Sequence, residues 1–348
     1  MRKIGAALAA ATVGLAGSAH AQQASTANVQ IYGRLDLSAN AITYSGGPNR
    51  QTLSSDTSLF GFRGVEDLGG GLSAYFKLES GISPDLGAQG NATRLFNRES
   101  LVGLRDERFG AIQLGSQWTP ILWLSSATDP FGRAMTGAQF TLFQGLAARG
   151  YTNQFSNAVQ YITPKLAGFT GRLMLSAPEG TLNKNRAAGI DYSVDRLYAG
   201  LVYQSEQTDG TTLGIRSIGA TRSNTLALGA SYRMDVAKLF GYAQTNHVSG
   251  QPNATGYMAG ATVPVGQGEF RVSAMHTNRS NADASLFAVG YAYFLSKRTM
   301  LYTSAARLDN KGASRYAMWP SSQDVGAAGA PAAGQDVTGI QFGMRHLF

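Results

Sequence analysis

Residues 338–348 read TGIQFGMRHLF, and the pattern in this stretch indicates the class of fold. Its apolar or bulky side chains stand at every second position, with other residues between them. This alternation is the period of a β-strand, whose successive side chains point to opposite faces. A strand that crosses a bilayer at a tilt needs about 9 to 11 residues, which this stretch supplies. We predict lipid contact for one set and an inward direction for the other: Ile340, Phe342, Met344, His346 and Phe348 outward, Gln341, Gly343, Arg345 and Leu347 inward.

The same alternation recurs along the chain, between clusters of Gly, Asn, Asp, Ser and Pro. In 29–40 the odd positions are mainly apolar and the even positions mainly polar, and 72–80 repeats the pattern. Further candidate strands include 95–104 and 213–221. A soluble β-sandwich has the same period, but its strands average about five or six residues and most of these are longer. We predict an all-β fold, a transmembrane antiparallel β-barrel of about 16 strands.

The ends of this barrel have to meet. Unpaired backbone groups in lipid cost several kcal/mol each, so the first and last strands should pair and remove the sheet edges. We therefore expect 338–348 to pair with 29–40, and we assign Phe348 to barrel closure.

Residues 1–21 have the three parts of an export signal. Arg2 and Lys3 give a positive start, a short apolar stretch follows, and Ala19-His20-Ala21 places small residues where a signal peptidase reads. A spanning helix would need roughly 20 apolar residues, more than this stretch has. We expect cleavage before Gln22, which leaves 22–348 as the barrel domain.

The connections between the predicted strands alternate between tight turns and long loops, as a membrane barrel requires. The longest is 118–153, which shows no strand pattern. It is too apolar to remain solvated, because it includes Trp118, Trp123, Phe131 and Phe140. We expect this segment to pack inside the barrel.

Composition argues against catalysis and against nucleic-acid binding. The chain has no cysteine, and the histidines that follow residue 21 stand in separate predicted strands without metal-ligand spacing. The Gly69-Gly70-Gly71 run lacks the helix that a phosphate cradle needs. Without residues 1–21, 27 basic and 21 acidic side chains leave a charge of +6, but no basic run or stripe occurs. We expect a protein that is not an enzyme, with no cofactor, no metal and no nucleic-acid partner.

Six stretches in order resemble the trimeric general porins of Gram-negative bacteria, in particular the betaproteobacterial type. They are VQIYGRLDLS, FGFRGVEDLGGGLSAYFKLESG, FNRESLVGLRDERFGAIQLGSQWTP, NAVQYITPKLAGF, YAYFLSKRTMLY and GIQFGMRHLF. The resemblance implies a homotrimer in the outer-membrane lipid, exported through the periplasm. Each barrel would be a water-filled channel for passive diffusion of ions and small hydrophilic solutes, with 118–153 as its pore-constricting third external loop.

The resemblance also implies a basic ladder on the barrel wall opposite an acidic loop corner, here Asp129 of Asp129-Pro130-Phe131-Gly132. Arg34, Arg63 and Arg98 match the ladder positions. Strand parity independently places some side chains in the lumen, including Glu79 and Asp36 as neutralising partners. The predicted pore constriction is Arg34, Arg63, Arg98, Lys77, Arg172, Asp129 and Arg133.

The chain also departs from the family pattern. It reads Gly115-Ser116-Gln117 where relatives often read Gly-Arg-Gln, and Leu59 stands where a basic residue is frequent. Both changes weaken the positive wall, which Arg133 in the loop partly restores, so some anion preference is expected. Two alternatives remain open from the residues: a monomeric outer-membrane enzyme or adhesin on a similar barrel, and a soluble secreted β-protein.

Overall fold

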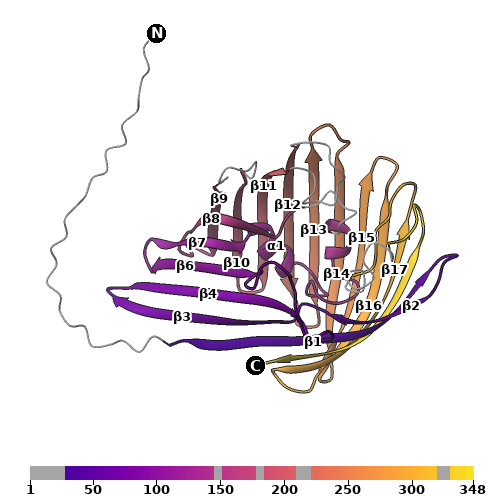
Figure 1. Ribbon diagram of the computed structural model, residues 1–348, viewed down its shortest axis with the longest axis horizontal. Helices are drawn as coiled ribbons and strands as arrows, with labels where there is room; N and C mark the ends of the chain where they lie inside the picture. The colour runs from indigo at the N-terminus through magenta and orange to yellow at the C-terminus, as the bar shows by residue number, and fades with distance from the viewer. Residues whose placement is uncertain (1–27, 145–150, 178–183, 209–220, 320–329) are drawn as a thin grey trace, which may run out of the picture.

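The computed structural model describes residues 28–144, 151–177, 184–208, 221–319 and 330–348, and the predicted signal peptide 1–21 lies outside them. The strands of the described residues, apart from the short β5, form one antiparallel sheet (Figure 1). Its first half contains β1 Gln30–Tyr44, β2 Arg50–Ser55, β3 Leu59–Gly69, β4 Leu72–Ser83, β5 Ala88–Gln89, β6 Glu99–Asp106, β7 Gly110–Trp118, β8 Gln154–Ile162 and β9 Phe169–Ser176. Its second half contains β10 Arg186–Val194, β11 Leu197–Thr208, β12 Thr221–Arg233, β13 Lys238–Val248, β14 Ala254–Val265, β15 Gly268–Arg279, β16 Ala284–Phe294, β17 Thr299–Asn310 and β18 Val337–Leu347.

These elements make a closed barrel of sixteen strands, as predicted. β2 and β3 both pair with β1 and form one barrel strand, interrupted at residues 56–58, where Thr57 adopts a φ of 100°. β5 pairs only with the end of β4, outside the main sheet. The predicted strand 95–104 begins later, at Glu99. Most of the predicted strand 213–221 lies outside the described residues, and β12 begins at Thr221.

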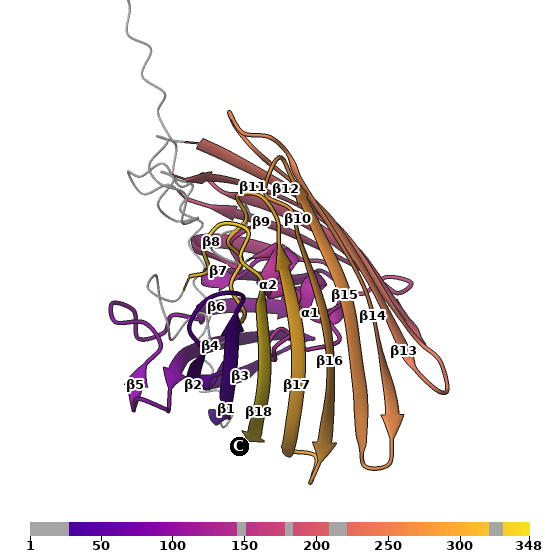
Figure 2. The same ribbon diagram turned by 90° about the vertical axis from the view of Figure 1, so that its right-hand side faces the viewer.

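β1 and β18 close the barrel, side by side in Figure 2, from Arg34↔Leu347 to Tyr44↔Val337. Beyond the Arg34–Leu347 pair, Gly33 N donates to Phe348 O and Phe348 N donates to Gly33 O, both at 3.1 Å. A Cβ atom on Gly33 would lie 2.2 Å from Phe348 Cζ, so the ring lies directly against this glycine. The closing pair expected from the sequence is therefore present, and Phe348 completes it.

Alternate residues along the strands face opposite sides of the sheet. In β18, Ile340, Phe342 and Met344 are exposed on the outer face, while Gln341 is fully buried on the inner face. The predicted parity is confirmed for these four residues, whereas Leu347, predicted to face inward, is 39% exposed at the end of the strand. The outer face bears exposed apolar side chains around the whole barrel, among them Val102, Ile112, Leu173, Ile190, Leu228, Val272, Val289 and Leu301.

The segment between β7 and β8 packs on the inner wall. It contains two short helices that the sequence pattern does not indicate, α1 Pro120–Ala127 and α2 Phe140–Phe143. Its buried residues share one apolar cluster with the inner faces of β11 to β17, and α1 lies within the barrel in Figure 1. Residues 145–150 of this segment lie outside the described part. No helix in the described residues combines the length and apolarity needed to cross a bilayer.

Candidate functional site

A cavity of about 510 Å³ lies between the inward segment and the wall formed by β1 to β4. The segment shares its apolar cluster mainly with β11 to β17, while the cavity lies beside Arg34 of β1 and beside β2, β3 and β4. Four of the predicted cations line this cavity: Arg34, Lys77, Arg98 and Arg133. Among the described residues, Glu79 is the acidic residue of the lining. Positive side chains therefore dominate the lining.

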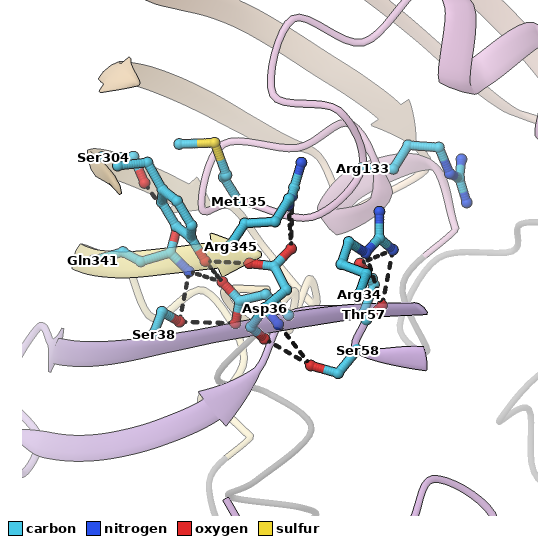
Figure 3. Close-up of polar contacts among 12 residues, drawn as sticks. Arg34, Asp36, Ser38, Thr57, Ser58, Arg133, Met135, Ser304, Gln341 and Arg345 are labelled. Carbon is cyan, nitrogen blue, oxygen red and sulfur yellow. Dashed lines mark hydrogen bonds and ion pairs between the residues drawn. The ribbon is translucent and has the colours of Figure 1, made fainter. Parts of the chain in front are cut away.

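Arg34 projects inward from β1 and is held by the interruption between β2 and β3. Its Nε and Nη2 donate to the carbonyl oxygen of Thr57 at 3.2 and 2.8 Å, and Nη2 also contacts Thr57 Oγ1 at 2.5 Å (Figure 3). These partners are neutral. Among the described residues, no carboxylate oxygen lies within 4.0 Å of this guanidinium, so Arg34 forms no direct ion pair, although Asp36 and Glu79 act on it at longer range.

Lys77 and Arg98, in contrast, share acidic partners. Lys77 Nζ lies 2.5 Å from Glu99 Oε2 and 3.2 Å from Glu79 Oε2, and Arg98 Nε lies 2.6 Å from Glu79 Oε1. Glu79 thus has the neutralising position expected from its parity. Two cations and two carboxylates balance here, so this cluster adds little net charge to the cavity.

Arg133 comes from the inward segment, where its backbone has a φ of 57°. Its guanidinium donates to Ser125 Oγ at 2.5 Å, Gln144 Oε1 at 2.6 Å, Asn153 Oδ1 at 3.1 Å and Tyr151 Oη at 3.2 Å. All four acceptors are neutral, and in the described chain no carboxylate lies within ion-pair distance. Arg34 and Arg133 are therefore two positive charges on one cavity that form no direct ion pair with a described carboxylate.

Two predicted basic residues lie outside this lining. Arg63 is exposed, donates to Gln30 Oε1 at 3.0 Å and lies over the Tyr32 ring. Arg172 forms an ion pair with Asp191 on the neighbouring strand β10. Neither residue lines the cavity, and their assignment to the constriction stays a prediction.

Asp129 is placed inside the inward segment rather than on the cavity. The carboxylate is buried and accepts three backbone hydrogen bonds, from Phe131 N at 2.8 Å, Gln139 N at 3.0 Å and Arg133 N at 3.1 Å. It holds the turn that presents Arg133. Asp129, expected to face the basic wall across the pore, therefore stabilises the fold of the inward segment here.

Titration of Asp129 should change the stability of this segment. Burial raises the pKa of Asp129 to about 6, although the three N–H donors lower it. A folded-state pKa above the unfolded value stabilises the packed segment below about pH 4, and this contribution, on the order of 3 kcal/mol, is lost as the pH rises through about 6. We expect more open-channel current noise near about pH 7.5 than near about pH 4. Asp129→Asn, which does not titrate, should show a smaller pH difference, because the buried Glu206 still accepts from Thr152 of this segment. An undiminished difference in this variant would show that Asp129 is not its source.

A polar cluster that includes Asp36, Ser38, Gln341 and Arg345 lies at the barrel seam (Figure 3). Arg345 of β18 pairs with Asp36 of β1 at 2.7 Å, and the Tyr302 hydroxyl lies 2.8 Å from Asp36 Oδ1 and 2.7 Å from Asp56 Oδ2. Gln341 accepts from Thr136 N at 2.8 Å. Strand parity predicts an inward Asp36 but gives no signal for Asp56, because their contact depends on the interruption between β2 and β3.

Aromatic side chains complete the cavity lining. Trp118, Trp123, Phe140 and Trp319 all contribute, and Arg98 lies 5.0 Å from the Trp118 ring centroid. The apolar content of 118–153 predicts burial for the first three, but not their place beside the cations. In the described residues, no group of three or more His, Asp or Glu side chains is arranged to hold a metal ion.

Comparison with known proteins agrees with this geometry. Residues 5–313 match the family described as Gram-negative porin. Outer membrane porin protein 32 of Delftia acidovorans is 32% identical, over 98% of this chain and 99% of the relative. An outer membrane porin protein of Bordetella pertussis is 27% identical, over 85% and 92%.

A solved structure is also similar to this chain. The anion-selective porin from Comamonas acidovorans superposes with a TM-score of 0.82 at 30% identity, over 92% of this chain and 100% of that one. A family match across most of the chain, together with the closed barrel, shows that this protein belongs to the Gram-negative porins and is a passive diffusion channel of the outer membrane.

Proposed function

We propose that the channel prefers anions and that Arg34 and Arg133 set this preference. The observation that carries the proposal is that both guanidinium groups line the cavity with neutral partners only, while Lys77 and Arg98 are offset by Glu79 and Glu99. Arginine stays protonated at all physiological pH values. Fixed positive charge at a narrow water-filled passage raises the local concentration of anions and lowers that of cations. The anion selectivity named for the Comamonas relative supports the same conclusion.

The reversal potential across a salt gradient tests this proposal. Purified protein reconstituted in a planar bilayer, with KCl more concentrated on one side, should give stepwise conductance and a reversal potential directed toward that of chloride. A potential near that of potassium would refute anion preference while leaving the channel itself established.

The family resemblance further supports three proposals about the mature protein. Three copies assemble as a homotrimer, residues 1–21 are removed as a signal peptide, and solutes leave the pore chemically unchanged because the protein is not an enzyme. Native mass measurement in detergent tests the first. Sequencing the amino terminus of protein from outer membranes tests the second, with Gln22 expected first.

A further inference from the structure

The tryptophans of this chain gather in one place. The sequence contains three, and all three line the cavity that carries the arginines: Trp118 at the end of β7, Trp123 on α1 and Trp319 before β18. Phe140 joins them, with its ring centroid 4.3 Å from that of Trp319. Such concentration on a polar cavity requires an explanation other than general composition.

Lipid anchoring does not explain these rings. Porin aromatic residues commonly form girdles on the outer face at the two bilayer surfaces, whereas these three tryptophans line an internal cavity. Nor does packing fully explain them, because Trp123 is 43% exposed. Exposed apolar area costs roughly 25 cal/mol per Å² relative to its burial. An exposed indole ring gives no advantage to a passage for inorganic ions.

The rings lie next to the cations. The Arg98 guanidinium lies over Trp118, and that of Arg133 lies 5.2 Å from the centroid of Phe140. A guanidinium binds a carboxylate through charge-assisted hydrogen bonds, and an indole face stacks on a flat ring. Pockets of roughly 300 to 1,000 Å³ hold small organic ligands, and this cavity of about 510 Å³ falls in that range.

We propose that the cavity is a binding subsite for aromatic carboxylates, which enter with the carboxylate toward Arg34 and Arg133 and the ring against the tryptophans. This inference rests on the proposed anion preference and adds a solute class to it. The guanidinium groups select the charge, and the indole rings select a flat π-face.

Block of single-channel KCl current by added acids tests the proposal. Benzoate carries the ring, cyclohexanecarboxylate has the same charge and similar size without a π-face, and acetate has neither ring. Aromatic stacking is worth about 1 kcal/mol, so benzoate should half-block the current at a roughly five-fold lower concentration than cyclohexanecarboxylate. Equal half-blocking concentrations for these two acids in the wild-type channel would overturn the proposal.

A matched pair of variants locates the effect. Trp123→Leu keeps an apolar side chain but removes the most exposed indole, and should bring the benzoate to cyclohexanecarboxylate ratio toward one. Phe109→Leu makes a similar change at a 68%-exposed residue of the β6–β7 turn and should leave the ratio at its wild-type value. A preserved ratio in Trp123→Leu would remove that indole from the site and contradict the proposal.

The reversal potential, measured on the same membranes, separates the two proposals. Chloride preference without discrimination between the two ring acids would leave the proposed function standing and refute the aromatic subsite. Discrimination between the two ring acids without chloride preference would refute the proposed anion preference and leave the aromatic subsite standing.

Discussion

Replacing both Arg34 and Arg133 with glutamine is expected to abolish the anion preference of the channel. One unit charge about 5 Å from a permeating ion in water contributes roughly 0.8 kcal/mol, a factor of roughly four in the local concentration of either sign of ion, before salt screening. Removing two such charges should lower the chloride-to-potassium permeability ratio by roughly an order of magnitude or more. The measurement is the zero-current potential in a KCl gradient, with single-channel conductance recorded alongside.

The position of the charge supplies the control for this experiment. Arg63→Gln removes the same charge from an exposed residue outside the cavity lining, and should shift the potential much less than Arg34→Gln. Arg133→Lys keeps the charge but loses the planar hydrogen-bonding fork, which separates selectivity from the role of Arg133 in holding the segment. An equal shift from Arg63→Gln would mean that the potential follows total charge rather than this cavity.

Deleting Phe348 is expected to reduce the yield of folded barrel several-fold. The deletion removes both backbone hydrogen bonds to Gly33 and the ring that covers it, at the one junction that closes the sheet. Backbone groups left unpaired in lipid cost several kcal/mol. Heat-modifiable mobility on gels measures the folded fraction, since a folded barrel migrates differently before and after boiling. Wild-type yield from the deletion would contradict a closing role for this residue.

A glycine pair tests the same closure without shortening the chain. Alanine at Gly33 would place its Cβ 2.2 Å from the Phe348 ring and 2.8 Å from the carbonyl oxygen of Leu59, so both ring and backbone oppose it. We expect a loss of about 1 to 3 kcal/mol. Gly241→Ala in β13 is the control, because its Cβ would meet no atom of the described structure within 4 Å.

Regular alternation is enough to assign the faces of the strands that carry it. The inner and outer faces of 29–40 and most of 338–348 follow from a period of two, since a half-buried strand leaves one parity in lipid and the other in water. In 72–80 the burial does not alternate, but the inward parity of Lys77 and Glu79 agrees with their place on the cavity. The sequence also predicts lumen positions for Arg34, Lys77 and Arg98, and all three line the cavity.

Alternation does not predict segments with irregular backbone. The alternation does not reveal β2, because the break at residues 56–58 interrupts it, and Asp56 lies in that break. The helices α1 and α2 are too short for a recognisable helical period. The pore role of Asp129 stays a prediction. Family position does not reveal that its carboxylate is buried and accepts hydrogen bonds from the backbone N–H groups of Phe131 and Gln139.

The strand that ends at Phe348 illustrates the difference between local and long-range information. The barrel, its closing strand and the lumen parity of most pore-lining cations can be read from the sequence, because alternation along one strand is a local property. Only the folded chain shows which cations form no ion pair. It also shows that all three tryptophans line the same cavity as these cations. Those properties depend on distances between residues far apart in the sequence, which the path of the inward segment sets.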